Sequence, residues 1–217
     1  MSKFNAQKQL VIDACLKLSN AGYLAGTGGN LALRLTDELF AVTPSGADYF
    51  ALGPDDICVL RLNNLEQLEG NLKPSVESAM HAAMLCFKKG MQASVHTHQP
   101  MASAIALLNI DLPVLGRDNQ IALGDKVAIV PYAPSGTGFL VRNFKKCLRP
   151  DVHAYLLKNH GVICAAADMA GAICNVGRIE AAAAGFLRTQ IDAFPNLPVA
   201  LRSMALDTLD PNHFNKD

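Results

Sequence analysis

Hydrophobic side chains follow two different periods along the chain. Apolar residues recur three and four positions apart, as on one helix face, in these segments: 4–20, 73–90, 100–109, 138–148 and 168–190. Apolar positions alternate with polar ones, or form short runs that end at a turn residue, in these segments: 30–35, 38–46, 57–62, 95–98, 126–132 and 154–166. The pattern predicts helices over the first set and strands over the second, with the last strand segment broken at Gly161 and the last helix capped by Asp168.

The order of these elements predicts the α/β class. Helices and strands are mixed but do not alternate strictly, and several neighbouring strands are joined by short turns, which favours antiparallel pairing. No internal repeat, linker or low-complexity stretch divides the chain, so we expect residues 1–217 to form a single domain. The tail after residue 190 carries three prolines and is predicted to be irregular or to hold a short closing element.

The helix predicted over residues 73–90 has recognisable ends. Ser75 can act as its N-cap, and Glu77 would then lie in the first turn, where a carboxylate favours the helix dipole. Gly90 follows two lysines and provides a stop.

Composition narrows the classes of partner. Charged residues make up 18% of the chain against about 25% in average soluble domains, while 50% of the chain is hydrophobic, which indicates a large interface between subunits. Lys plus Arg and Asp plus Glu number 19 each, so we expect no nucleic-acid partner.

No apolar run approaches the ~18 residues of a membrane span, and the start, MSKFNAQKQL, resembles no signal peptide. The six cysteines form no CxxC pair and fit reduced thiols in the cytoplasm.

A histidine pair gives the first candidate chemistry. His96 and His98 would lie on one face of a strand, about 7 Å apart, so that both imidazoles could reach one metal ion. His160 ends another predicted strand and is a candidate third ligand, and Glu77 lies 19 residues before His96. Three neutral imidazoles would leave Zn²⁺ its full charge and an open position. An HxH pair alone is weak support for a metal, because most such pairs bind nothing.

An anion site is the second candidate. The GTGGN segment (26–30) offers glycine N–H groups with Thr27 and Asn30 as side-chain donors, and TPSG offers Ser45 and the N–H of Gly46. The hydroxyl of Ser75 and the N–H groups of the helix that follows could complete a phosphate site. Each segment alone is better explained as a turn or a cap. Neither the dinucleotide nor the Walker A pattern is present, because Leu31 replaces the third glycine of the former and no GK[ST] occurs.

Taken together, these motifs resemble one family. GTGGNLALR, VTPSG, KPSVESAMH, VHTH, YAPSGT and LLKNHGVI stand in the order and spacing of the class II aldolase/adducin family, over about residues 5–190. The layout is most similar to members that cleave L-fuculose 1-phosphate. The resemblance implies a central, largely antiparallel sheet flanked by helices on both sides, and a homotetramer with active sites between subunits.

The resemblance also implies roles for single residues. His96, His98 and His160 would hold one Zn²⁺ per subunit. Glu77 would be the catalytic acid/base and would touch the metal when no substrate is bound. The phosphate would be bound by these residues: Thr27, Gly29, Asn30, Ser45, Gly46 and Ser75.

Two positions depart from the aldolase pattern. Val76 stands where the aldolases have a second serine in the phosphate loop, so one donor is missing. Arg117 stands where they have a tyrosine acid, and arginine is a poor proton donor because it stays charged. Arg117 could instead contact an anionic part of the substrate.

The implied function is zinc-dependent cleavage of a ketose 1-phosphate, similar to L-fuculose 1-phosphate. The products would be dihydroxyacetone phosphate and an aldehyde, formed through a metal-stabilised enediolate. Sugar-phosphate epimerisation, dehydration and decarboxylation of a sugar-acid phosphate are alternatives. A non-enzymatic adducin-like module is the least favoured, since every zinc ligand and the glutamate are present.

Overall fold

The structure is a computed structural model that describes residues 2–24, 26 and 28–209. Within this part of the chain, nine strands form one sheet in the order β4-β3-β2-β1-β5-β9-β8-β7-β6. The strands are β1 (Asn30–Arg34), β2 (Leu39–Val42), β3 (Cys58–Arg61), β4 (Gln67–Glu69), β5 (Ala93–Thr97), β6 (Leu112–Pro113), β7 (Lys126–Val130), β8 (Ala154–Leu157) and β9 (Gly161–Ala166). All neighbours pair antiparallel except β7 and β8, which are parallel.

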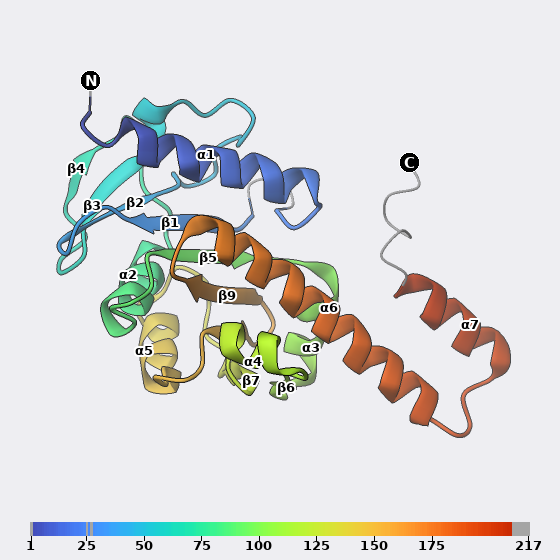
Figure 1. Cartoon of the computed structure of the whole chain (residues 1–217). Helices are drawn as coiled ribbons and strands as arrows, with labels where there is room; N and C mark the ends of the chain where they lie inside the picture. Colours follow the sequence, from blue (N-terminus) through green and yellow to red (C-terminus); the bar gives the residue numbers. More distant parts are fainter. Residues whose placement is uncertain (1, 25, 27, 210–217) are drawn as a thin grey trace.

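Helices cover both faces of this sheet (Figure 1). They are α1 (Asn5–Asn20), α2 (Ser78–Phe87), α3 (Pro100–Leu108), α4 (Arg117–Leu123), α5 (Gly138–Cys147), α6 (Met169–Ala193) and α7 (Val199–Thr208), with a short 3-10 turn at Pro54–Asp56. Helices α1, α3 and α6 pack on one face, and α2 and α5 pack on the other. The predicted α/β class with a largely antiparallel sheet and two helical layers is confirmed.

Strand alternation sends successive side chains of β5 to different layers. Ala93 and Val95 join the core under α1, α3 and α6, whereas Ser94 and His96 face the α2 side. The neighbouring strand β1 does the same, with Leu31 in the first core and Asn30 on the α2 side. Because apolar residues fill the first face, the polar residues of both strands gather in one place beneath α2.

Helix α2 begins later than its sequence indicated. Ser75 is not its N-cap: the helix starts at Ser78, and Glu77 occupies the N-cap position without a side-chain cap bond. The Ser75 N–H donates to the Thr43 carbonyl (3.1 Å), beside a bridge between Pro44 and Pro74. This pairing holds the chain extended at Ser75, so the helix cannot form until the turn that follows. Glu77 therefore lies just before the helix rather than in its first turn.

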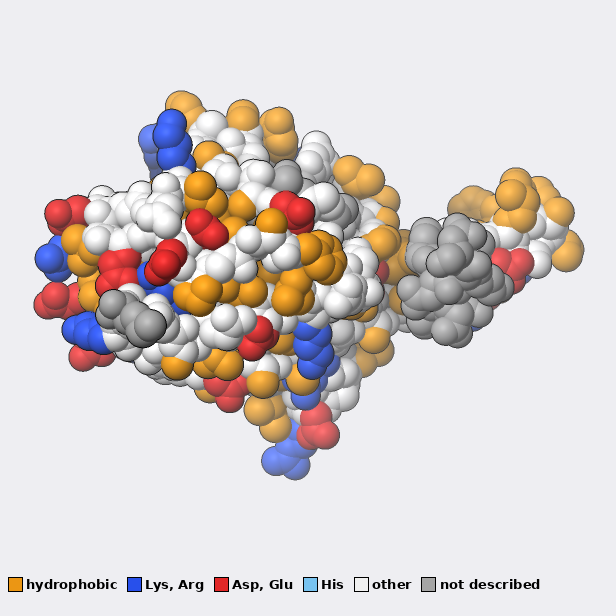
Figure 2. Space-filling view, turned by 90° about the horizontal axis from the view of Figure 1, so that it is seen from above, with side chains coloured by type: hydrophobic (Ala, Val, Ile, Leu, Met, Phe, Trp, Pro, Cys, Tyr) orange, Lys and Arg blue, Asp and Glu red, His pale blue; other side chains and the backbone are white. Residues whose placement is uncertain are grey.

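The C-terminal helices extend away from the sheet. Figure 1 shows α6 crossing the sheet and continuing beyond it, with α7 at its far end. Asp168 caps α6 as predicted by accepting the Gly171 N–H (2.6 Å). No residue of α7 is buried, and hydrophobic side chains lie at the end of this arm in Figure 2. None of the described helices is long and apolar enough to cross a membrane.

Candidate active site

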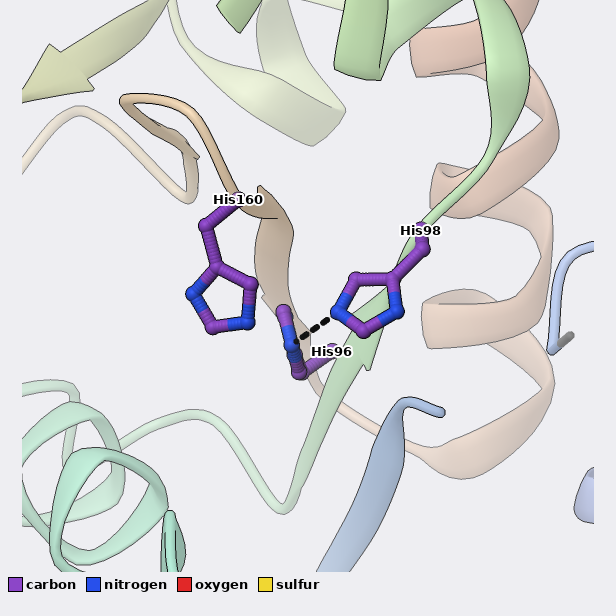
Figure 3. Close-up of side chains that lie close together, drawn as sticks. All are labelled: His96, His98 and His160. Atoms are coloured by element: carbon purple, nitrogen blue, oxygen red, sulfur yellow. Dashed lines mark hydrogen bonds between the residues drawn. The ribbon is translucent and has the colours of Figure 1, made fainter. Parts of the chain in front are cut away.

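Three histidines converge where β5 ends and β9 begins (Figure 3). His96 lies within β5, His98 follows that strand directly, and His160 immediately precedes β9. Each imidazole has one ring nitrogen that lies within 4.8 Å of a ring nitrogen of the other two. The Nε2 atoms of His96 and His98 are 3.0 Å apart. The sequence prediction that these three side chains meet agrees with this geometry.

The protonation of His96 is set by its neighbours. Its ring is fully buried, and Nδ1 donates to the Val162 carbonyl across the β5–β9 pair (2.7 Å). This bond places the proton on Nδ1 and leaves the Nε2 lone pair facing the cluster. Burial lowers the pKa of His96, and burial also lowers the pKa of His98. Both imidazoles are thus neutral, the form that binds a metal.

Glu77 faces the histidines from the other side. Its Oε2 lies 3.2 Å from His96 Nε2, and its Oε1 lies 3.5 Å from His160 Nε2. Burial raises the pKa of this carboxyl, but the adjacent histidines and two hydrogen-bond donors outweigh it and hold the pKa below its usual range. The donors are Asn30 Nδ2 to Oε2 and Ser135 Oγ to Oε1, both at 2.8 Å. The buried carboxylate is therefore ionised and held on both oxygens.

The donor set fits a divalent metal. Zinc with bonds of about 2.0–2.1 Å in a tetrahedral site needs its nitrogen ligands about 3.3–3.5 Å apart, and the three imidazole nitrogens lie within 4.8 Å of one another. Two facing Nε2 atoms at 3.0 Å need a shared proton or a cation between them. His96, His98 and His160 could hold this ion, with the Glu77 carboxylate beside it.

Strands β5 and β9 approach each other closely at Gly161, next to the histidine cluster. A Cβ at this position would lie 2.5 Å from the Thr97 carbonyl oxygen, 2.6 Å from His98 Cδ2 and 3.2 Å from His96 Cε1. The absence of a side chain here lets β9 lie against the histidine segment of β5.

We expect Gly161→Ala to destabilise the fold by about 1–3 kcal/mol, the usual cost of overpacking, and to weaken metal binding. The backbone carbonyl of Thr97 cannot rotate away as a side chain would. Gly90→Ala is the control, because a Cβ at Gly90 meets nothing within 4 Å. Denaturant unfolding and metal analysis of both variants provide the measurement. Equal stability of the two variants would contradict this account of Gly161.

A small polar cavity opens beside Glu77. Its volume is about 160 Å³, and it is lined by Gly28, Gly29, Asn30, Pro44, Ser45, Gly46, Ser75, Val76, Glu77, His98, Ser135 and His160. Of the residues proposed to bind phosphate, Gly29, Asn30, Ser45, Gly46 and Ser75 are all among them. Thr27 lies outside the described residues. Segments distant in the sequence therefore meet at one cavity large enough for a small anion.

Two backbone N–H groups beside this cavity are already used within the chain. The N–H of Ser45 donates to the Lys73 carbonyl (2.9 Å), and the N–H of Ser75 is used by Thr43, so neither backbone group is free for a ligand. Ser75 Oγ accepts the Glu77 N–H (3.2 Å) and keeps its own proton to donate. Gly29 has φ +83° and a carbonyl that accepts from the Tyr49 hydroxyl (2.6 Å), which gives it a structural role as well.

Ser135 is a site residue that sequence reasoning assigned no role. It lies in the loop between β7 and α5, within the YAPSGT motif, and donates to Glu77. Gly136, with φ +71°, follows it and lies against Val76: a Cβ there would be 3.1 Å from the valine side chain. The only sequence signal was the motif itself, because nothing in its spacing shows that the loop folds over Glu77.

Arg117 lies elsewhere. It is the first residue of α4, is exposed, and does not line the cavity of its own chain. A contact between Arg117 and substrate therefore remains a prediction, and would require the site of a neighbouring subunit.

The fold and the site define a candidate metalloenzyme, with a buried carboxylate and converging imidazoles beside a polar cavity. Residues 9–187 match the family described as Class II Aldolase and Adducin N-terminal domain. The chain belongs to the class II aldolase/adducin family. The resemblance seen in the motifs is thereby confirmed, and the chain is an enzyme of the class II aldolase kind.

Several known proteins are similar over most of their length. A 5-deoxy-D-ribulose 1-phosphate aldolase from Bacillus thuringiensis serovar kurstaki is 34% identical over 183 residues, which cover 83% of this chain and 84% of the relative. An L-fuculose phosphate aldolase from Escherichia coli strain K12 is 30% identical over 185 residues, 85% of this chain and 84% of the relative. A solved structure of an L-fuculose 1-phosphate aldolase superposes with a TM-score of 0.79 at 29% identity, covering 96% of this chain and 97% of the other.

Proposed function

We propose that this chain is a zinc-dependent aldolase that cleaves a ketose 1-phosphate into dihydroxyacetone phosphate and an aldehyde. The observation that carries the proposal is the position of Glu77, between the histidine cluster and the cavity lined by serine hydroxyls. The similar aldolases act, by their names, on 5-deoxy-D-ribulose 1-phosphate and L-fuculose phosphate. Substrates of this kind carry a phosphate on C1 next to a ketone at C2.

The metal would be held by His96, His98 and His160. A divalent ion there acts as a Lewis acid that draws electrons from a carbonyl and stabilises the negative charge that develops when the C3–C4 bond breaks. We propose zinc because the three ligands are neutral nitrogen donors, a set that suits zinc in an open catalytic site.

The phosphate would be bound by the cavity residues. The Ser75 hydroxyl, the Ser45 hydroxyl and the second N–H of the Asn30 amide are donors on residues that line it. We further propose that Gly29, Gly46 and Thr27 contribute to the same phosphate site. The Val76 side chain cannot donate a hydrogen bond, so this chain has one side-chain donor fewer than the aldolase pattern.

Glu77 would perform the proton transfer. It is ionised in the described structure, and its two oxygens lie close to the cluster where the reacting carbons would be held. As the C3–C4 bond breaks, the Glu77 carboxylate would take the proton of the C4 hydroxyl, so that the aldehyde forms. The resulting carboxyl would then return this proton to the carbon that was C3, completing dihydroxyacetone phosphate. Ser135 and Asn30 would hold the carboxylate for that transfer.

The test is a substrate panel with a coupled assay for dihydroxyacetone phosphate. L-fuculose 1-phosphate, 5-deoxy-D-ribulose 1-phosphate and related ketose 1-phosphates should release it together with an aldehyde. The same panel should include pentulose 5-phosphates and sugar-acid phosphates. Epimerised product, dehydrated product or carbon dioxide without dihydroxyacetone phosphate would replace the aldolase with the corresponding family alternative.

Assembly into a homotetramer is a further proposal. Exposed hydrophobic side chains occur on α7 (Val199 84% and Met204 64% exposed) and next to α4 (Leu115 78% exposed), consistent with the low charged fraction. Contiguous exposed apolar patches usually mark interfaces, and we propose that both regions contribute to contacts between subunits. If active sites lie between subunits, the exposed Arg117 of one subunit could contact substrate in its neighbour.

All six cysteines are free thiols, which fits a reducing compartment, and we propose the cytoplasm.

Light scattering at micromolar concentration should therefore give about four times the chain mass of 23.1 kDa. Replacing Val199 and Met204 together by polar residues should lower that mass, because it removes apolar contact area on the arm. Replacing Phe50, which is similarly exposed but lies beside the residues at the end of α1 rather than on α7, is the control. A stable and fully active wild-type monomer would contradict the proposed assembly.

A further inference from the structure

A chain of buried hydrogen bonds extends from Glu77 into the interior beneath α2. Asn30 Nδ2 donates to Glu77 Oε2 (2.8 Å), and Asn30 Oδ1 lies 2.6 Å from His81 Nε2. His81 Nδ1 lies 2.8 Å from Ser94 Oγ. His81 and Ser94 are fully buried, and Asn30 and Glu77 are at most 6% exposed. Solvent therefore cannot replace the bonds that His81 makes.

The elements fix this arrangement. His81 lies one helical turn after Glu77, so both side chains lie on the same side of α2. Asn30 of β1 is directly opposite His96 of β5, and Ser94 lies two residues before His96 on the same face. The chain of bonds thus crosses from α2 to both central strands.

The direction of every bond follows from the carboxylate. An ionised carboxylate only accepts, so the Asn30 nitrogen must face Glu77 and the Asn30 oxygen must face His81. His81 Nε2 must then carry a proton. Burial lowers the pKa of His81 to about 4, so the ring is neutral and its Nδ1 accepts from the Ser94 hydroxyl. Any reversal would place two acceptors against each other at buried atoms, which is costly.

We propose that His81 is a positioning residue, which fixes the Asn30 side-chain amide and through it the Glu77 carboxylate. An amide rotates easily about its last torsion. With His81 donating to Oδ1, one amide N–H is aimed at Glu77, and the other remains for a ligand in the cavity that Asn30 lines. Asn30 therefore links the anion site to the proton-transfer group. The catalytic part of this inference rests on the proposed function, whereas the arrangement of protons does not.

The first measurement is independent of activity. Two-bond nitrogen–proton NMR correlations of protein with ¹⁵N-labelled histidine should show His81 neutral, with its proton on Nε2, at neutral pH. The signal is assigned by its disappearance in His81→Gln. A proton on Nδ1 alone, or a charged ring, would overturn the proposal whatever the enzyme's substrate is.

The second measurement compares two polar replacements of the same residue. Glutamine can place an N–H where His81 Nε2 lies, whereas asparagine reaches only the Ser94 side. His81→Asn should lower kcat by about 10–100-fold, the usual effect of losing a residue that orients a site group, with zinc content unchanged because no metal ligand is altered. His81→Gln should keep kcat within a few-fold of wild type.

The outcomes separate the two proposals. Equal losses in both variants, or no loss in His81→Asn, would show that the donor to Asn30 does not matter and would overturn the positioning role. A wild-type enzyme that cleaves no ketose 1-phosphate would overturn the proposed function alone, and the NMR measurement would still decide the orientation of His81. If His81→Asn does not fold, the tautomer and the activity of His81→Gln still test the proposal.

Discussion

Glu77→Gln should lower kcat by roughly 10²–10⁴, the range for losing a positioned proton-transfer group, while fold, metal content and assembly are kept. Glutamine has nearly the shape of glutamate but cannot take or return a proton at neutral pH. Asn30 and Ser135 donate to the two carboxylate oxygens, so the amide oxygen can keep one of these bonds. The loss should therefore appear in turnover rather than in stability.

A structural role for Glu77 predicts a different result. A carboxylate in a first helical turn favours the helix dipole by about 0.3–1 kcal/mol, and its removal would leave turnover nearly intact. In the structure, however, Glu77 precedes the helix, makes no cap bond, and its oxygens lie 3.2 and 3.5 Å from imidazole nitrogens. Its position is therefore better explained by chemistry than by helix stability.

Solvent deuterium exchange into dihydroxyacetone phosphate measures this step without knowledge of the aldehyde. Wild type should catalyse the exchange, and Glu77→Gln should not. Glu180→Gln is a matched control. Glu180 is also a largely buried carboxylate, but it accepts the N–H groups of Met101 and Ala102 at the start of α3, so its loss should lower stability and leave exchange in place. Equal exchange by wild type and Glu77→Gln would remove Glu77 from the reaction.

The sequence predicted the histidine cluster well because two of its residues are spaced two apart, as side chains on one face of a strand are. The i, i+2 spacing of His96 and His98 was enough to place both rings on one side of β5, and the glycine after His160 marked the start of β9. Periodicity also predicted the long helix α6 and its Asp168 cap, because both depend on local residues.

Contacts across the fold could not be predicted in the same way. The start of α2 depends on pairing of Ser75 with Thr43, which are distant in sequence, so local capping rules placed it too early. Ser135 reaches Glu77 from a loop that packs closely against Val76 at Gly136, a contact between segments distant in sequence. Strands β4 and β6 have three and two residues and are too short to carry a period. Whether Arg117 lies near substrate depends on how subunits assemble, and no sequence pattern in this chain predicts that arrangement.

His96→Ala should abolish metal binding and with it activity. Wild-type protein should contain close to one divalent metal per chain by elemental analysis, and the variant close to none. His96 is the most buried of the three imidazoles, and its Nε2 lies next to both His98 and Glu77. Two histidines and a carboxylate would remain, but the ion would lose its central nitrogen ligand. The alanine variant also leaves the buried Val162 carbonyl without its donor, at a cost of about 1–3 kcal/mol in stability.

His96→Asn separates these two effects. The asparagine amide can reach the Val162 carbonyl from the position of Nδ1 but provides no nitrogen at the position of Nε2. It should therefore restore part of the stability and none of the metal. His153→Ala controls for loss of a partly buried histidine: His153 contacts Lys88 (3.0 Å), far from the cluster in the fold, and its removal should leave metal content at the wild-type level. Full activity of wild type after exhaustive chelation would contradict a metal-dependent reaction, because the neutral imidazoles alone supply no positive charge to stabilise negative charge that develops on a substrate.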